Sequence, residues 1–470
     1  MAERQLQGRT VIYTDAEEIT AQNVVDVLKK AVEKNQTNVD DIKYLYDYYK
    51  GKQPILQREK TFNDTICNII VENRANEIVS FKTGYFLSSR IQYIDSGEDE
   101  ATDDLKLLNG WATLESKESS DLELAEWMSI CGTGYRLILN KEEQIDDSDS
   151  PFEFFVLDPA TTMVVYSSKL GHKPMMGVTF YTLADEDKTV YNVYTESEFF
   201  VIMDDKIMET NPHILGGIPV IEYPANKARL GDFEIVIPLL DAINNMQSNR
   251  ADGVEQFIQA ILCLENMQIA EDDETGFMTR LKEVGGLLLP EGSKAYYLSQ
   301  QLNQGDTQTF KDDLYESVLY ICGMPNRNGG SSTSDTGAAV ILRDGWSDAE
   351  ARAKITESYF KKSERKFLNM LIMLSNDIGG TNLTLGQVDI RFPRRNYTND
   401  SAKVTNLIAM LGCDWIPPQA AYEHSDMFPD PDAAFKEAKK WHDELEQKQT
   451  MSLMTQNTEE DEEDIPEDEE

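Results

Sequence analysis

The segment "GDFEIVIPLLDAINNMQSNRADGVEQFIQAIL", residues 231–262, decides how this chain is organised. Its apolar residues recur at helical spacing, which predicts one long helix with Pro238 near its start. A second helical segment, "DTQTFKDDLYESVLYICGMP" at 306–325, ends at Gly323. Between them, residues 264–303 contain two short strand patterns, "GLLLP" and "KAYYLSQQL". The sequence therefore predicts a small mixed module held between a helix that leads to it and a helix that returns.

The hydrophobic period changes twice outside this unit. Residues 16–140 show mainly the helical period, whereas residues 152–222 are short β-branched and aromatic runs broken by Gly, Pro, Asn and Asp. That second pattern is typical of an antiparallel sheet. The helical period returns at residue 349, interrupted by one strand pattern in "LTLGQVDIRF". We therefore predict an α+β fold that is mainly helical.

The chain is strongly acidic, with 84 Asp and Glu against 44 Lys and Arg and a net charge of −40. Such a surface repels the phosphates of nucleic acid, which argues against a protein that grips DNA tightly. Residues 459–470 read "EEDEEDIPEDEE" and contain ten acids. A segment this poor in apolar residues buries too little surface to fold, so residues 448–470 are predicted to be a disordered acidic tail.

No motif in the sequence indicates chemistry. There is no P-loop, no GxSxG and no GxGxxG, and the scattered cysteines and histidines show no metal-ligand spacing. "CGTGYR" at 131–136 lacks the lysine of a phosphate loop and predicts a turn between a helix and a strand. We expect no catalytic residue, no metal and no cofactor, and hence no enzyme. The N-terminus has no signal-peptide core and no apolar run approaches the ~20 residues of a membrane span, so we expect an intracellular protein without membrane contact.

Five segments in a fixed order resemble the portal proteins of tailed bacteriophages, of the siphophage type. They are "YDYYKGKQPIL" (46–56), "NIIVENRANEIVSFKTGYFL" (68–87), "HILGGIPVIEYPANKARLGDFEIVIPLLDAINNMQS" (213–248), "SDTGAAVILRDG" (334–345) and "VDIRFPRRNYTNDSAKVTNLIAML" (388–411). Each segment alone is a weak motif, and their joint order around the central helix–module–helix unit is the more specific feature. The resemblance covers residues 19–445.

The resemblance implies a ring of twelve copies at one vertex of a viral capsid, through which the terminase motor drives double-stranded DNA. It also implies contacts with the major capsid and scaffolding proteins and with a head–tail adaptor. The protein would be found in the virion, and in the host cytoplasm during assembly.

The family is built from regions called wing, stem, clip and crown, and the resemblance assigns each to part of this chain. The implied regions are wing 1–230, first stem helix 231–263, clip 264–303, second stem helix 304–325, return wing with tunnel loop and long helix 326–393, helical crown 394–447 and acidic tail 448–470. Apolar stem positions are expected to bury against each other or against a neighbouring subunit. These positions are Phe257, Ile258, Ile261, Leu314 and Val318.

The stretch "GGSSTSDTGAAVILRDGW" at 329–346 has the composition of a flexible linker followed by small apolar residues. In the family context, Ala338 and Ala339 would let neighbouring subunits pack closely around a narrow bore. The tunnel loop facing the DNA would be Asp344, Gly345, Trp346, Ser347 and Asp348. Periodicity alone favours the alternative, an ordinary surface loop followed by a turn in the core.

A second function class stays open at this point. The chain could be an acidic ring-forming adaptor or scaffold of a particle that passes no DNA. Electron-microscope images of the purified protein would separate the two, because a portal ring has an open axial channel wide enough for a duplex.

Overall fold

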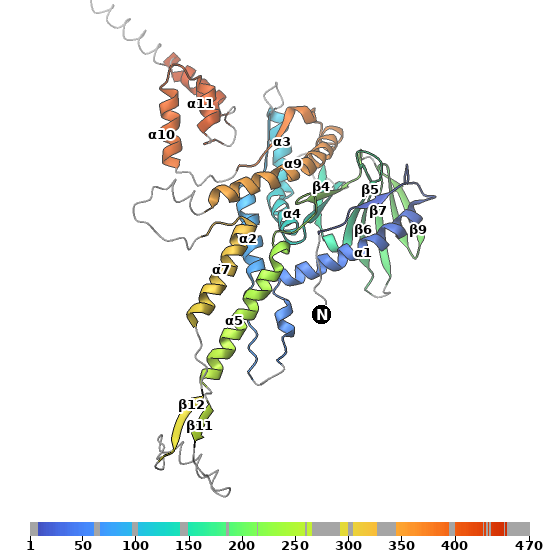
Figure 1. Cartoon of the computed structure of the whole chain (residues 1–470). Helices are drawn as coiled ribbons and strands as arrows, with labels where there is room; N and C mark the ends of the chain where they lie inside the picture. Colours follow the sequence, from blue (N-terminus) through green and yellow to red (C-terminus); the bar gives the residue numbers. More distant parts are fainter. Residues whose placement is uncertain are drawn as a thin grey trace, which may run out of the picture.

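The computed structural model describes most of the chain, in segments separated by gaps. The described residues are 8–60, 66–95, 102–141, 149–184, 188–213, 215–258, 261–265, 292–298, 304–326, 345–393, 400–425, 427–428, 431, 434–445 and 447–448. They form a mixed helical and β-sheet body, a pair of long helices that projects from it, and a small helical unit near the carboxyl end (Figure 1). Within these segments, no helix combines the length and the apolar character that crossing a membrane requires.

The first part of the body is a six-stranded sheet covered on one face by α1 (Val24–Tyr49) (Figure 1). Its strand order is β1 (Ile12–Thr14), β5 (Thr162–Ser167), β6 (Pro174–Thr182), β7 (Thr189–Tyr194), β8 (Glu198–Met203) and β9 (Lys206–Pro212). The antiparallel pairing predicted from the two-residue period is confirmed for β5 to β9, and β1 adds to β5 in parallel. Val24 and Leu28 of α1 pack on Val178 and Phe200 of the sheet, which buries this core.

The second part of the body surrounds a three-stranded sheet of order β10 (Val220–Pro224), β3 (Thr133–Asn140) and β4 (Phe152–Leu157). The helices α3 (Thr102–Leu114), α4 (Lys117–Cys131) and α9 (Trp346–Asp377) contribute to its core, as does the small sheet of β2 (Gln92–Asp95) and β13 (Val388–Arg391). The predicted turn in "CGTGYR" is confirmed, since Gly132 has φ +80° between α4 and β3. A Cβ atom there would lie 2.0 Å from the carbonyl oxygen of Arg229, so the turn requires glycine.

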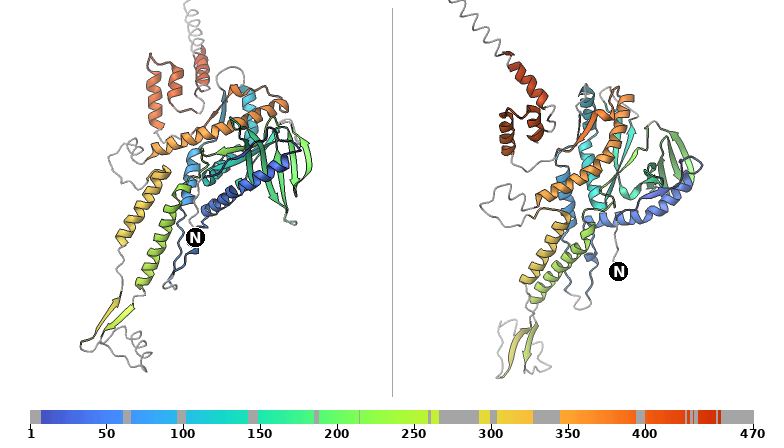
Figure 2. Two further views of the ribbon diagram at one scale, coloured as in Figure 1. Left: turned by 45° about the vertical axis from the view of Figure 1, so that its right-hand side comes forward. Right: turned by 45° about the horizontal axis from the view of Figure 1, so that its top comes forward.

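The projecting pair consists of α5 (Ile237–Ile258) and α7 (Gln304–Cys322), which lie side by side and lead to a two-stranded ribbon (Figures 1 and 2). The ribbon pairs β11 (Ile261–Glu265) with β12 (Lys294–Leu298) in antiparallel register. The two predicted helices are present, but the first ends at residue 258 and not at 263. Of the two strand patterns predicted between them, "KAYYL" is β12, whereas "GLLLP" at 286–290 lies outside the described residues. The apolar run "ILCLE" finds a pairing partner in "KAYYL", and strand pairing replaces the last helical turn.

One boundary in the amino-terminal half differs from the prediction of a continuous helical region. Residues 66–73 form neither a helix nor a strand, and α2 (Arg74–Phe86) begins only after Asn73, whose side chain accepts a hydrogen bond from the Asn76 amide at 3.4 Å. The isoleucines of this stretch follow a helical spacing without forming a helix. The backbone amides of Asn68, Ile70 and Glu72 bond instead to side chains of α5, as described below.

The carboxyl-terminal unit contains α10 (Asp400–Leu411) and α11 (Pro418–Ser425), followed by helical residues 434–445. It lies beyond α9, on the opposite side of the body from the ribbon (Figure 1). The Arg391 guanidinium at the end of β13 donates to the Phe428 carbonyl at 3.1 Å and links the unit to the body. In the part of the chain that the structure describes, short 3₁₀ turns occur at η1 (Pro54–Gln57), η2 (Pro159–Thr161), η3 (Glu234–Val236) and η5 (Leu385–Gln387).

Candidate functional site

The predicted stem positions lie in three different elements, α7, α5 and β11. Val318 is fully buried in a core shared by α1, α2, α4, α5 and α7, and Leu314 packs half-buried against that core. Phe257 and Ile258 are the last two residues of α5. Ile261 was expected on the helix but belongs to β11, opposite Leu298. Leu314 and Val318 of α7 therefore pack against other helices of the same subunit. The helix α5 does not continue to residue 261, because the strand β11 begins there.

A polar ladder joins α5 to residues 68–72. The amides of Asn68, Ile70 and Glu72 donate to side chains of α5 one helical turn apart. The acceptors and distances are Asp252 Oδ1 at 2.6 Å, Ser248 Oγ at 3.0 Å and Asn244 Oδ1 at 2.8 Å. Four helical residues rise about 6 Å and two extended residues about 6.6 Å, so the two repeats match. All three acceptors are buried, and each is satisfied by a backbone amide that would otherwise lack a partner.

Asp252 also holds two cations from the segment that precedes the ladder. Its Oδ2 lies 2.9 Å from Arg58 Nη2 and 2.5 Å from Lys60 Nζ. Burial by itself would raise the pKa of Asp252, but the Lys60 ammonium, the Asn68 amide and the Arg58 guanidinium together lower that pKa to about 2. The ladder was missed in the sequence, although polar residues at 244, 248 and 252 on a helix of otherwise apolar spacing were a signal for it.

The expected tunnel loop is only partly a loop. Trp346, Ser347 and Asp348 form the first turn of α9, and Gly345 precedes it in a left-handed conformation with φ +83°. The indole of Trp346 lies 6.1 Å from the ring of Phe81 and 6.0 Å from that of Tyr85, both on α2. These aromatic contacts hold the first turn of α9 against α2. Asp344, Ala338 and Ala339 lie outside the described residues.

A buried charge cluster fastens α9 to the body. It consists of Lys117 and Asp121 of α4, Arg136 of β3 and Glu364 of α9, and all four side chains are almost completely buried. Lys117 Nζ lies 2.6 Å from Asp121 and 2.8 Å from Glu364, while Arg136 lies 2.5 Å from Asp121 and 3.4 Å from Glu364. Two cations and two carboxylates therefore neutralise each other. The sequence gave no signal for this contact, because Arg136 and Glu364 lie far in sequence from each other and Glu364 lies far from the Lys117–Asp121 pair.

Tyrosines complete the hydrogen bonding of Glu364. The hydroxyls of Tyr223 and Tyr93 each donate to a different oxygen of this carboxylate at 2.7 Å. Burial opposes the charge of Glu364, yet the nearby Lys117 and Arg136 outweigh burial and hold its pKa below the usual range. Glu364 is thus an ionised carboxylate with every contact supplied from within the chain.

Nearly all polar contacts described above fix one helix or strand to another, which is the construction of a structural scaffold. Residues 28–451 match the protein family described as "Phage portal protein, SPP1 Gp6-like". Because the match covers most of the chain, the chain belongs to this family of phage portal proteins. The resemblance stated from the sequence is confirmed, and with it the portal fold.

Solved structures with a related arrangement come from gene transfer agent particles. "Virion of native gene transfer agent (GTA) particle" has a TM-score of 0.47 at 11% identity and covers 83% of this chain and 94% of that chain. "Neck of native GTA particle computed with C12 symmetry" has a TM-score of 0.46 at 10% identity and covers 76% of this chain and 90% of that chain. No curated protein sequence matches this chain.

Proposed function

We propose that this portal protein assembles into a ring of twelve copies at the head–tail vertex, and that double-stranded DNA enters and leaves the particle through the axis of the ring. The observation that carries this proposal is the family match over residues 28–451. The projecting helices α5 and α7 with their ribbon support it, because an elongated arm of this kind lets one part of a subunit reach a partner away from the body (Figure 2). The proposed role is structural and needs no catalytic residue.

The proposed regions follow the observed boundaries. The body would be the wing, α5 and α7 the stem, the ribbon of β11 and β12 the clip, and the unit of α10 and α11 the crown. The terminase motor and a head–tail adaptor would bind the assembled ring, and the major capsid and scaffolding proteins would surround it. Assembly would take place in the host cytoplasm. The part of the chain before α9, including Ala338, Ala339 and Asp344, would line the narrowest part of the channel.

Electron microscopy of the purified full-length protein tests the ring. We expect class averages with twelvefold symmetry and an open axial channel wide enough for a duplex. Closed discs, filaments or rings without a bore would contradict the proposal and favour an adaptor that passes no DNA.

Charge reversal beside the proposed channel tests DNA passage. Changing Asp344 and Asp348 together to Lys adds two positive charges per copy, which would hold phosphates by releasing counterions. Ring assembly should stay normal, because Asp348 is exposed and substitutions at exposed positions usually cost little stability. DNA packaging into particles should slow, and the ring should gain salt-sensitive affinity for DNA. Normal packaging without added affinity would place these carboxylates outside the channel.

A further inference from the structure

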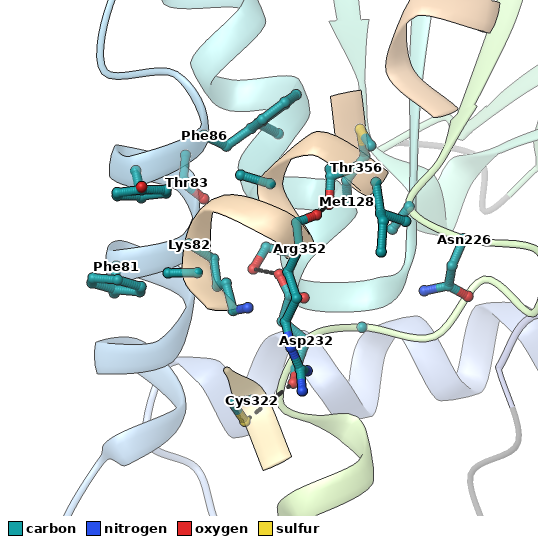
Figure 3. A pocket seen from close by; sticks show the side chains of 18 of the residues that line it. Phe81, Lys82, Thr83, Phe86, Met128, Asn226, Asp232, Cys322, Arg352 and Thr356 are labelled. Atoms are coloured by element: carbon teal, nitrogen blue, oxygen red, sulfur yellow. Dashed lines mark hydrogen bonds between the residues drawn. The ribbon is translucent and has the colours of Figure 1, made fainter. Parts of the chain in front are cut away.

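A groove lies where α2, α7 and α9 meet the loop that leads into α5 (Figure 3). It encloses about 260 Å³, and its floor is apolar, with Phe86 and Met128 among the lining residues. Three isoleucines from three different elements stand at its edge with much of their surface exposed. They are Ile235 at 55%, Ile321 at 41% and Ile355 at 59% exposure. Large apolar side chains gathered around one groove are typical of a contact surface.

The groove carries net positive charge in a chain of net charge −40. Its charged lining residues are Lys82, Arg352 and Asp232. Lys82 points into the groove from α2, while Arg352 comes from α9 and lies beside Asp232 (Figure 3). Arg352 donates to the carbonyl of Ile321 at 2.7 Å, so it caps the end of α7. A region with more cations than carboxylates is complementary to most other surfaces of the same chain.

Lys82 is the unusual member of this set. Within the described residues no carboxylate oxygen lies within 4 Å of its ammonium, although Asp232 is near enough to favour the charged form. Burial lowers the pKa of Lys82, and the positive charge of Arg352 lowers it further. A partly buried cation of this kind is destabilising until a carboxylate reaches it.

We propose that the groove is a contact between copies of this chain: a neighbouring subunit inserts an apolar segment with a carboxylate, which pairs with Lys82. The inference rests on the proposed ring. Copies in a closed ring meet head to tail, so each must present two different and complementary faces. The chain has 84 acidic residues against 44 basic ones, so a second copy offers many more carboxylates than cations for pairing with Lys82. The groove is therefore the receiving face.

Zero-length cross-linking identifies the partner. Subunits grown with ¹⁴N and with ¹⁵N are mixed in equal amounts before assembly, and the rings are treated with a carbodiimide, which joins an amine only to a carboxylate in direct contact. We expect the Lys82 peptide to be joined to an Asp or Glu peptide, with half of these products carrying one light and one heavy partner. Products in which both peptides always share one label would place a segment of the same chain in the groove and overturn the proposal.

Substitution provides an independent readout. Lys82→Met removes the charge and keeps the shape, so the isolated subunit should keep or raise its melting temperature while the concentration needed for half-assembly rises at least tenfold. Lys82→Arg should restore part of the assembly. The control is Lys30→Met on the exposed side of α1, which should change neither quantity. Unaltered assembly of Lys82→Met overturns the contact while leaving the portal ring intact, and wild-type protein that forms no ring at all would overturn both.

Discussion

Two regions of this molecule that each contain two cations contrast with each other. In the buried charge cluster, Lys117 and Arg136 face Asp121 and Glu364, and every charge is neutralised within one chain. The result is a rigid joint between α4, β3 and α9. Because all four side chains are almost fully buried, the cluster is complete before any partner arrives.

The groove also holds two cations, but only the single carboxylate of Asp232 lies among its lining residues. Lys82 is partly exposed, and Arg352 donates to backbone carbonyls. Both side chains can therefore still form an ion pair with a carboxylate of another subunit. Charge balance therefore distinguishes a contact within the subunit from a surface that binds a neighbouring subunit. A balanced cluster stabilises the subunit, whereas an unbalanced one stabilises the assembly.

The largest loss of stability is expected when one carboxylate of the buried charge cluster is removed. Glu364→Gln leaves Lys117 and Arg136 with one carboxylate and should lower the free energy of unfolding by about 3–5 kcal/mol. Chemical denaturation followed by tryptophan fluorescence measures this loss. Asp103→Asn, which removes an exposed ion pair with Lys106, is the control and should leave the midpoint unchanged. Equal effects of the two variants would show that the cluster is not the joint described here.

A new charge without a partner sharpens the same comparison at the stem. Leu314→Asp places a carboxylate against the apolar core around Val318 and should cost about 2–3 kcal/mol. The ring population, measured by light scattering, should fall with it. Ser317→Asp introduces the same charge at an exposed position of α7 and should cost less than about 0.5 kcal/mol. If both variants are equally stable, Leu314 does not pack as described.

Asp252 is expected to make the stability of the folded chain depend on pH. Its pKa is about 2 in the folded chain and about 3.9 when unfolded, so its contribution of about 2 kcal/mol is fully present above pH 4. That contribution is lost as the pH falls from 4 toward 2. Asp252→Asn should therefore be less stable than wild type at pH 7, and the difference should shrink at pH 2–3. A difference that does not depend on pH would show that Asp252 is not held by the cations of Arg58 and Lys60.

The smallest effect is expected from the acidic tail. Deleting residues 459–470 removes ten negative charges and changes the net charge from −40 to −30. If the groove works by direct contact, assembly and melting temperature should stay the same, because screening weakens attraction beyond about 10 Å at ordinary ionic strength. Weaker assembly after the deletion would mean that overall acidity, and not the local contact at Lys82, drives the association.

Periodic patterns made the large elements predictable. The apolar spacing in α5 and α7 and the two-residue period of β5 to β9 reflect burial along a continuous segment, which the sequence records directly. The end of α5 was missed because the pairing of Ile261 with Leu298 depends on a strand more than thirty residues away. Trp346 was expected in a loop, since its contacts with Phe81 and Tyr85 of α2 cannot be read from its neighbours in sequence.

The candidate contacts were harder to predict than the elements. Lys117 and Asp121 are four residues apart and indicate a surface pair, and nothing nearby shows that Arg136 and Glu364 bury them. Lys82 reads as an ordinary solvent-facing lysine of α2. Its setting arises only when the loop before α5 and the first turns of α9 meet it. Such sites depend on tertiary geometry, and a single sequence holds little information on it.

The ladder between residues 68–72 and α5 has a mechanical consequence. Its three hydrogen bonds stand across the long axis of α5, so a force along that axis loads all three together, as in a lap joint pulled in shear. The three hydrogen bonds share this force, so they break together and not one after another. Because both repeats are about 6 Å long, the only other positions in which rungs meet acceptors are a whole helical turn away. The ladder therefore resists small displacements of α5 along its axis, and its hydrogen bonds can form again only after a shift of a whole helical turn.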